Sequence, residues 1–289
     1  MPVSVKRVQM NPFLGLLQAM RPWNLLMIVL CMFIIRNALL SIEVLDDLIF
    51  MLCSMAMVSA AAAGNLINDY FDIREDAINK PKKALVGRLF KRRWALAGHH
   101  VLVVVSMVAA SAASWATHDV RLVLWMAILN ALLWGYSPWF KRKFLLGNGL
   151  IALAVGQLPL WTALPTNQTS HSLIVGYAVL SFLVTVIREL TKDLQDVNGD
   201  AQAGYDTLPV RWQPQATIKL LKILLLIMLV VLSGAARWLF LAYGVTWPNL
   251  LYWMPFFMGI WMLFQGNIKA VSAYLKVTLG GGMLVLLFV

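Results

Sequence analysis

The sequence contains little cysteine and little histidine. Two cysteines, Cys31 and Cys53, and four histidines occur in 289 residues. Both cysteines lie in apolar stretches, with no CxxC pair and no histidine cluster nearby, which argues against a disulfide framework and against a zinc site. We therefore expect both cysteines to be buried as small hydrophobic side chains, and we assign no role to the histidines.

Charged residues are scarce as well. They make up 13% of the chain, whereas hydrophobic residues make up 61%, well above the roughly 45–50% apolar content of soluble domains. Apolar runs long enough to cross about 30 Å of hydrocarbon recur along the chain, which excludes a soluble protein and a barrel of short alternating strands. The sequence predicts an all-α integral membrane protein that forms a single domain over residues 1–289.

Hydropathy, with proline, glycine and charge as boundaries, predicts nine transmembrane spans. The first carries Arg36 and the last carries Lys276, and a charge within a span requires water, a partner or the interface. In the first 20 residues we expect no removable signal peptide but an interfacial helix that leads into the first span. The predicted spans are 22–41, 47–67, 94–116, 121–140, 145–164, 171–190, 217–242, 248–266 and 268–288.

The basic residues alternate between the predicted loops. The loops after the second, fourth and sixth spans are rich in lysine and arginine, whereas the intervening loops contribute little beyond Arg36, Arg121 and Arg237. Because cytoplasmic loops collect basic residues, this alternation predicts a cytoplasmic N-terminus and an external C-terminus. It also accounts for the net charge of +11 without nucleic acid, since basic residues there face anionic lipid or an anionic substrate.

Acidic residues are the scarcest charged class, and most of them gather at two places. The chain has 13 aspartates and glutamates against 24 lysines and arginines. Nine of the 13 lie on the basic side, after the second and sixth predicted spans. These nine are Asp69, Asp72, Glu75, Asp76, Glu189, Asp193, Asp196, Asp200 and Asp206.

On a helix, each acidic group forms one stripe. Asn68, Asp72 and Asp76 follow i, i+4, i+8, and the set 193, 196, 200 follows i, i+3, i+7. Like charges at these spacings repel, and a helix C-terminus makes negative charge still less favourable. Because hard divalent cations such as Mg²⁺ bind carboxylates together with phosphates, two facing stripes would hold a Mg²⁺-diphosphate. The alternative interpretation is that these aspartates are solvated juxtamembrane residues.

At these residues the sequence resembles the UbiA superfamily of intramembrane prenyltransferases. The family's NDxxDxxxD motif stands here as "NDYFDIRED", from Asn68 to Asp76, and its KDxxDxxxD motif stands as "KDLQDVNGD", from Lys192 to Asp200. The run "AGYDTLPV" is similar to the family's GxxTLPV sequence. Two smaller signatures, "RPWN" at 21–24 and "YSPWFKR" at 136–142, agree with this resemblance.

The resemblance implies a bundle of about nine transmembrane helices with a central cavity open near the cytoplasmic side. It also implies Mg²⁺-dependent transfer of an isoprenyl group from an allylic polyprenyl diphosphate to a lipophilic acceptor, with two Mg²⁺ ions bridging the diphosphate. Such a substrate is a charged head on a long apolar tail, so it needs cations at the water edge and an apolar cavity behind them. Mg²⁺, Lys and Arg would stabilise the departing diphosphate.

The resemblance further implies three groups of site residues. The expected metal ligands are Asn68, Asp72, Asp76, Asp193, Asp196 and Asp200. The expected catalytic residues are Asp69, Asp72, Lys192 and Asp196, with Asp69 as a ligand or an acceptor-side base. The expected substrate-binding residues are Arg21, Asn24, Asn65, Asn68, Lys80, Arg88, Tyr136, Lys141, Arg142 and Arg188.

The sequence departs from the family pattern at two places. Many relatives carry an arginine-proline pair after the first motif, whereas this chain has "INKPKKALVGR", so that Lys80, Lys82, Lys83 or Arg88 would have to contact the diphosphate. Lysine offers a point charge where arginine offers a bidentate fork. In addition, Asp206 places an extra carboxylate near the second motif, for which the sequence offers no explanation.

Several functions share these motifs. "NDYFDIREDAINKP" is most similar to the branch that adds a geranylgeranyl group to geranylgeranylglyceryl phosphate, a glycerol ether lipid, and we expect such an acceptor. The alternatives are prenylation of an aromatic quinone precursor, a membrane terpene cyclase, and a transporter of phosphorylated lipid, which would place charges near mid-bilayer. We expect an integral protein of a prokaryotic cytoplasmic membrane, with geranylgeranyl diphosphate, a lipophilic acceptor and the bilayer as partners.

Overall fold

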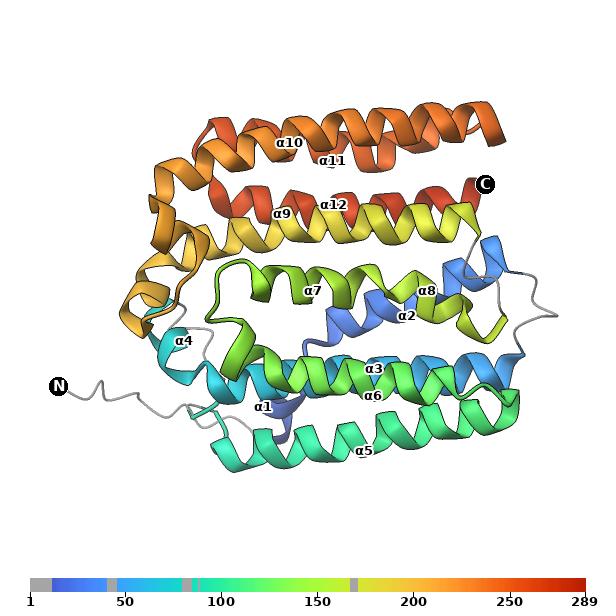
Figure 1. The fold of residues 1–289 in the computed structure, drawn as a ribbon, viewed down its shortest axis with the longest axis horizontal. Coiled ribbons are helices and arrows are strands. Elements are labelled where there is room, and N and C mark those ends of the chain that lie inside the picture. Colours follow the sequence, from blue (N-terminus) through green and yellow to red (C-terminus); the bar gives the residue numbers. More distant parts are fainter. Residues whose placement is uncertain (1–11, 41–45, 80–84, 88, 167–170) are drawn as a thin grey trace. The chain divides into compact units, whose positions relative to one another are not determined.

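The computed structural model describes residues 12–40, 46–79, 85–87, 89–166 and 171–289. These residues are nearly all helical (Figure 1), and the only extended pairing among them is an isolated bridge between Val86 and Phe90. The helices are α1 (Pro12–Ala19), α2 (Pro22–Leu39), α3 (Asp47–Phe71), α4 (Ile73–Asn79), α5 (Arg92–Thr117), α6 (Arg121–Gly135), η1 (Tyr136–Phe140), α7 (Leu146–Gly156), α8 (Leu158–Ala163), η2 (Leu164–Thr166), α9 (Ser172–Ala203), α10 (Leu208–Tyr243), η3 (Trp247–Asn249), α11 (Leu250–Phe264), α12 (Ile268–Val285) and η4 (Leu286–Phe288).

The membrane class predicted from the sequence is confirmed. Within the described ranges, eight helical segments are long and apolar enough to cross a bilayer. Each coincides with a predicted span. The predicted span 248–266 corresponds to α11, whose 15 residues are fewer than the roughly 20 that a span usually needs. The chain is therefore an integral membrane protein, while the count of nine spans and the two orientations of the termini stay predictions.

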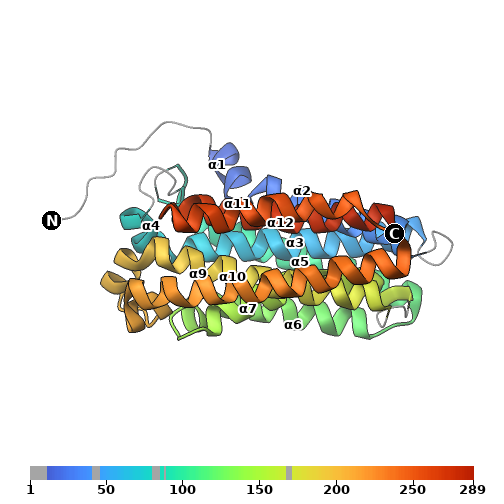
Figure 2. The same ribbon diagram turned by 90° about the horizontal axis from the view of Figure 1, so that it is seen from above.

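The chain divides into two compact units. The first comprises Met1–Val29 and Asp47–Arg142, and the second comprises Leu30–Asp46 and Lys143–Val289, so that α2 begins in the first unit and ends in the second. Within each unit the long helices run roughly along one direction (Figures 1 and 2). A single domain over the whole chain stays a prediction.

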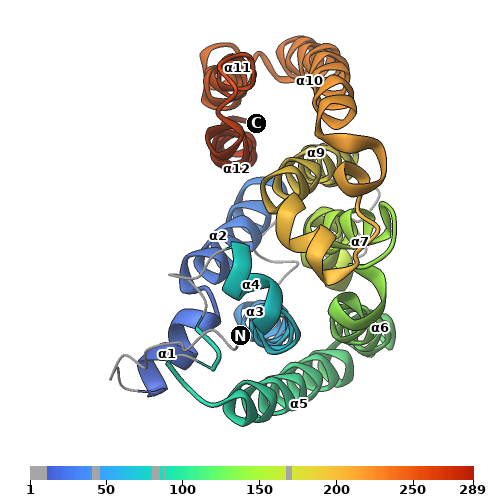
Figure 3. The same ribbon diagram turned by 90° about the vertical axis from the view of Figure 1, so that its left-hand side faces the viewer.

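In the first unit, small residues allow α3 and α5 to pack closely. Alanines are fully buried on both helices, and α3 also contacts α6, which packs on α5 (Figure 3). Two hydrogen bonds link these helices: Ser106 donates to the carbonyl of Ala56 at 2.9 Å, and Asn130 donates to Ser106 at 3.1 Å. His99 lies 3.0 Å from the carbonyl of Ala63. Small residues with interhelical hydrogen bonds are the usual means of helix association where water supplies no driving force.

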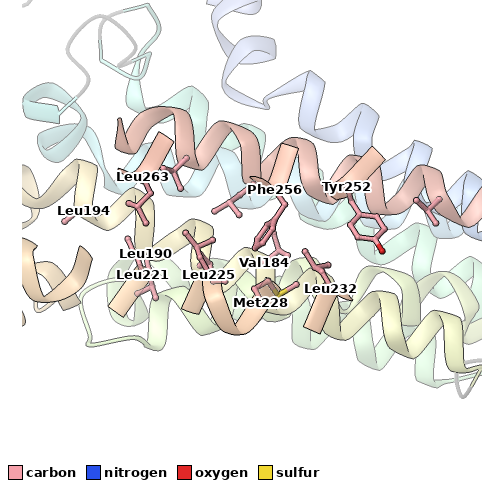
Figure 4. Close-up of a cluster of buried hydrophobic side chains, with 14 of the residues drawn as sticks. Val184, Leu190, Leu194, Leu221, Leu225, Met228, Leu232, Tyr252, Phe256 and Leu263 are labelled. Atoms are coloured by element: carbon pink, nitrogen blue, oxygen red, sulfur yellow. The ribbon is translucent and has the colours of Figure 1, made fainter. Parts of the chain in front are cut away.

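In the second unit, α9, α10, α11 and α12 surround an apolar interior, which is seen end-on in Figure 3. Phe256 of α11 is fully buried there, among aliphatic side chains that include Leu225 and Met228 of α10 (Figure 4). The crossing of α11 and α12 is close at Gly281, where an added Cβ would lie 2.1 Å from the carbonyl oxygen of Leu251. Only glycine permits this backbone approach.

The two acidic motifs lie on helices that extend beyond the predicted spans. The second predicted span ends at 67, whereas α3 continues to Phe71. The sixth ends at 190, whereas α9 continues to Ala203 and ends at Gly204, whose φ of 72° gives the left-handed C-cap that glycine favours. The seventh span was predicted from 217, but α10 begins at Leu208 and bends at Gln213, next to Pro214.

Candidate functional site

The first acidic motif lies at the end of α3 and around the turn that follows. The backbone amide of Asp72 donates to the carbonyl of Asn68 at 2.9 Å, and the amide of Asp76 donates to that of Asp72 at 2.8 Å. These i, i+4 bonds carry the helical spiral across the break between α3 and α4. The first stripe predicted from the sequence therefore has helical backbone geometry from Asn68 to Asp76.

Asp72 is the best buried acidic residue of this motif. Its side chain is 4% exposed, and its Oδ2 accepts from Lys141 Nζ at 2.6 Å and from Asn68 Nδ2 at 2.8 Å. Its other oxygen, Oδ1, is buried without a hydrogen-bond partner among the described residues. Burial raises the pKa of the Asp72 carboxyl above its usual range, and the charge of Lys141 opposes that rise.

A π-helical turn brings Lys141 to Asp72. The turn η1 follows α6 directly, and the amide of Lys141 donates to the carbonyl of Tyr136 at 2.8 Å, an i, i+5 bond. Relative to an α-helix, one extra residue in a turn shifts the following side chains by about 100° around the axis, and such turns are frequent at functional sites. From the same turn, Ser137 donates to Asn68 Oδ1 at 2.9 Å. Sequence reasoning assigned no role to Ser137, although it lies in the "YSPWFKR" signature.

Arg21 pairs with Asp69, the aspartate of the first motif that lies on α3. Its guanidinium lies 2.8 Å from Asp69 Oδ1, and its backbone φ of 60° is in the left-handed region between α1 and α2, which non-glycine residues seldom adopt. Asn65 donates to the carbonyl of Met20 at 3.0 Å. The contact of Asn65 therefore ties α3 to the segment that carries Arg21.

Arg92 is a further basic residue at the first motif, and it was not predicted as a site residue. The guanidinium of Arg92, at the start of α5, lies 3.9 Å from the ring centroid of Tyr70, a distance typical of cation–π contacts. Tyr70 is in the first motif. Three cations therefore lie beside this motif: Arg21 between α1 and α2, Arg92 on α5 and Lys141 at the end of η1. The signal in the sequence was the run of basic residues from 91 to 93.

The second acidic motif lies on α9, in the second unit. Asp193, Asp196 and Asp200 share this continuous helix, as their spacing predicted. Asn148 of α7 donates to Asp193 Oδ2 at 2.7 Å, and Asp200 is buried, with 4% of its surface exposed. Asn148 was not predicted as a site residue, because a single asparagine inside the predicted span 145–164 carries no motif that marks it.

Cations accompany this motif as well. Glu189 Oε1 accepts from Lys192 Nζ at 2.6 Å and from Arg188 Nη1 at 2.9 Å. The Nε of Arg188 is buried and has no hydrogen-bond partner among the described residues. Asp206, which the sequence left unexplained, accepts from Arg211 Nε at 2.9 Å in an exposed pair.

The other predicted residues that the structure describes lie on or next to the helices of the two motifs. Asn24 is in the first turn of α2, Asp76 is on α4, Tyr136 begins η1, Arg142 follows η1 and Asp196 is on α9. Lys80, Lys82, Lys83 and Arg88 lie outside the described residues. Among the described residues, no group of three or more His, Cys, Asp or Glu side chains converges as a ready metal site. The assigned roles therefore stay predictions.

An apolar cavity of about 360 Å³ lies inside the second unit. It is lined by residues of α9, α10, α11, α12 and η4, and on α9 the lining extends from Leu173 to Val184. At a rise of 1.5 Å per residue, Val184 lies roughly 13 Å along α9 from Asp193. The cavity thus lies on the part of α9 away from the acidic stripe. The predicted central cavity open near the cytoplasmic side stays a prediction.

Solved structures of known proteins share this fold. A structure of digeranylgeranylglyceryl phosphate synthase superposes with a TM-score of 0.69 at 21% identity, covering 97% of this chain and 100% of that one. A UbiA homologue from Archaeoglobus fulgidus, bound to DMAPP and Mg²⁺, superposes with a TM-score of 0.62 at 15% identity, covering 94% and 99%.

Sequence comparison gives closer relatives. The digeranylgeranylglyceryl phosphate synthase of Methanothermobacter thermautotrophicus is 32% identical over 203 residues, 70% of this chain and 66% of that protein. That of Hyperthermus butylicus is 32% identical over 216 residues, 72% of this chain and 70% of that protein. The match to the Haloquadratum walsbyi enzyme spans about half of its length, 52%. A model of the UbiA prenyltransferase family matches residues 20–272. This chain therefore belongs to the UbiA prenyltransferase family.

Proposed function

We propose that this protein transfers an isoprenyl group from an allylic polyprenyl diphosphate to a lipophilic acceptor, with Mg²⁺ bound to the diphosphate. The observation that carries the proposal is the Asp72 carboxylate. One of its oxygens is held by Lys141 and Asn68, and the other is buried without a partner among the described residues. A buried carboxylate oxygen is costly unless something binds it, and Mg²⁺ prefers such ligands.

The residues of both motifs fit a hard cation. Asp72, Asp76 and Asn68 would be ligands from the first motif, and Asp193, Asp196 and Asp200 from the second. All of them offer oxygen, and none offers sulfur or imidazole, which suits Mg²⁺ over softer metals. The A. fulgidus homologue was solved with DMAPP and Mg²⁺, which supports this choice. We propose two ions, in line with the two motifs.

The chemistry asked of the protein is to break the bond between the allylic carbon and the diphosphate oxygen. Bound Mg²⁺ would neutralise charge on the departing diphosphate. Arg21 and Lys141 at the first motif, with Lys192 and Arg188 at the second, would bind the remaining phosphate oxygens by charge-assisted hydrogen bonds. Asn24, Asn65, Lys80, Arg88, Tyr136 and Arg142 are proposed to complete the substrate contacts.

The acceptor must lose a proton as it forms the new bond. Asp69 is proposed as the base, because it is a carboxylate at the edge of the first motif whose partner, Arg21, is 44% exposed. Asp196 and Lys192 are proposed to act on the diphosphate side. These roles rest on residue chemistry and on the family.

For the acceptor we propose a glycerol ether lipid such as geranylgeranylglyceryl phosphate, with geranylgeranyl diphosphate as donor. Support comes from the relatives, since the proteins from M. thermautotrophicus and H. butylicus are both digeranylgeranylglyceryl phosphate synthases. The proposed location is the cytoplasmic membrane of a prokaryote. A topology reporter fused after Val289 should report the external side, and a cytoplasmic signal would show that a span was miscounted.

The test is a transfer assay on purified protein in lipid with Mg²⁺ and radiolabelled geranylgeranyl diphosphate. One sample receives geranylgeranylglyceryl phosphate and another 4-hydroxybenzoate. Label in an ether lipid supports the proposal, and label in the aromatic product assigns the protein to quinone biosynthesis. Diphosphate release with neither product points to an untested acceptor or to cyclisation. Asp72→Asn and Asp196→Asn should each lower turnover at least about 100-fold if the carboxylates hold the Mg²⁺ that stabilises the departing diphosphate. Asp119→Asn, in the loop between α5 and α6, is the matched control.

A further inference from the structure

A chain of three hydrogen-bonded side chains leads from η1 to the first motif. Ser137, 1% exposed, donates its hydroxyl to Asn68 Oδ1 at 2.9 Å. Asn68 in turn donates its amide nitrogen to Asp72 Oδ2 at 2.8 Å. Ser137 therefore has no direct hydrogen bond to Asp72, whose Oδ1 is proposed to face the cation. It is linked to Asp72 through Asn68 alone.

The direction of the Asn68 amide matters in this chain. An asparagine side chain ends in one acceptor and one donor group, and a half-turn exchanges them. If Asn68 were turned over, its oxygen would face the Asp72 carboxylate, so that two acceptors would repel each other in a buried place. The Ser137 hydroxyl stabilises the observed direction by donating to the Asn68 oxygen. In the turned direction it would face the amide nitrogen and could only accept, so the hydroxyl proton would lose this acceptor.

The orientation of Asn68 also decides which Asp72 oxygen is available. Oδ2 accepts from both Lys141 and Asn68, while Oδ1 accepts from no described residue. With two donors on one oxygen, the carboxylate is fixed in rotation. We propose that Ser137 is a positioning residue: by orienting Asn68, it holds the Asp72 carboxylate so that Oδ1 is presented to Mg²⁺.

The π-helical turn explains how Ser137 and Lys141 reach the same neighbours. They are four residues apart and bracket the turn, one on Asn68 and the other on Asp72. Gly135 precedes the turn, and a Cβ there would lie 3.0 Å from the Trp139 ring and 3.1 Å from the Phe140 ring. The turn thus packs its own aromatic rings over Gly135 and directs its two polar residues to the motif.

This inference rests on the proposed function, and its test measures metal binding directly. Mn²⁺ replaces Mg²⁺ as a spectroscopic probe, and its binding to the full-length protein in lipid is titrated by electron paramagnetic resonance with inorganic diphosphate present. Loss of one buried hydrogen bond in Ser137→Ala should weaken Mn²⁺ binding about five- to tenfold. In turnover assays, the Mg²⁺ concentration for half-maximal rate should rise by a similar factor, while kcat at saturating Mg²⁺ changes about twofold at most.

Two controls separate positioning from packing. Ser106→Ala removes another fully buried serine hydroxyl of the same unit, remote from Asn68 in the hydrogen-bond network, and should leave Mn²⁺ binding unchanged. In the Asn68→Ala background, Ser137→Ala should have no further effect, because Ser137 acts through Asn68. If Ser137→Ala does not fold, Ser137→Cys replaces it, since a thiol fills the site but donates only weakly.

The outcomes are distinct. Mn²⁺ binding by Ser137→Ala equal to that of the wild type would overturn the inference and leave the proposed function standing. An undiminished effect in the Asn68→Ala background would overturn it too, since Ser137 would then act through packing. If wild-type protein binds Mn²⁺ no better than Asp72→Asn, the proposed function fails, and the inference fails with it.

Discussion

Replacing Lys141 by methionine tests whether the Lys141–Asp72 pair is an electrostatic contact. Methionine keeps much of the apolar stem but removes the ammonium group, which lies 2.6 Å from the Asp72 carboxylate. Asp72 would be left buried, with only Asn68 as donor. Breaking a buried pair in this way typically costs about 3–5 kcal/mol.

The cost has an upper limit, because Asp72 can take up a proton. Protonating an aspartate costs about 1.4 kcal/mol for each pH unit above its unfolded-state pKa of about 3.9. This limits the electrostatic loss to roughly 4 kcal/mol at pH 7 and roughly 1.5 kcal/mol at pH 5. The sign follows from burial, since a carboxyl whose folded-state pKa is raised destabilises the fold increasingly as pH rises from the unfolded pKa toward the folded one.

The assay is thermal unfolding of purified protein in detergent with EDTA, from pH 5 to pH 8. Lys141→Met should unfold at a clearly lower temperature than the wild type at pH 8, and the difference should shrink toward pH 5. The double variant Lys141→Met/Asp72→Asn should regain much of the loss at pH 8, because no buried charge is left. An equal loss at both pH values would show that Lys141 acts by packing, and no loss at either would show that the pair does not form.

Three further outcomes are expected. Gly281→Ala should destabilise the second unit by about 1–3 kcal/mol or more, since its Cβ would meet the Leu251 backbone at 2.1 Å. The control Gly282→Ala should be tolerated, because the nearest contact of its Cβ is the Tyr177 ring at 3.7 Å. Equal melting temperatures of the two variants would show that α11 and α12 separate easily. Arg21→Ala should change the free energy of unfolding by less than about 1 kcal/mol, because Arg21 is 44% exposed. The same variant should slow prenyl transfer in the radiolabel assay. A large loss of stability with normal turnover would show that Arg21 has a structural role only. Arg121 lowers the pKa of Asp119, so Asp119→Asn should lower the free energy of unfolding by under about 1 kcal/mol above pH 4. The difference should vanish once the pH falls below the folded-state pKa of Asp119. Turnover should be unchanged, and any loss of turnover would disqualify Asp119→Asn as a control.

Sequence reasoning located the helices because their signal is strong. A run of about 20 apolar residues can hardly be anything but a helix in a bilayer, so each of the eight described spans overlaps a predicted one. The edges were less accurate at 67 and 190, because hydropathy falls where the acidic motifs begin, whereas the helices continue. The edge at 217 was less accurate because hydropathy is low over the polar residues before it, although α10 begins at Leu208. Hydropathy reports the solvent around a residue, while the helix ends where a cap such as Gly204 ends it.

The contacts of the motif could be predicted only in part. Spacing along one helix shows that Asn68 and Asp72 are neighbours, and they are hydrogen-bonded. Lys141 and Ser137, however, lie 69 residues from their partners, and Asn148 lies 45 residues from Asp193. No local pattern fixes such pairs. The π-helical turn was also invisible, because "YSPWF" has no pattern that distinguishes a π from an α turn.

The pairs change the electrostatic argument for a metal. From the sequence, carboxylates that repel one another at a helix end required compensation, and Mg²⁺ was the candidate. In the structure, Arg21 and Lys141 already compensate Asp69 and Asp72, so repulsion alone no longer requires an ion. What calls for a cation is more specific: the buried Asp72 Oδ1, which none of the described donors reaches. If Mg²⁺ binds there and diphosphate binds Lys141 and Arg21, cations and anions exchange partners while the local charge stays balanced. Such an exchange would let the site be stable both with and without substrate.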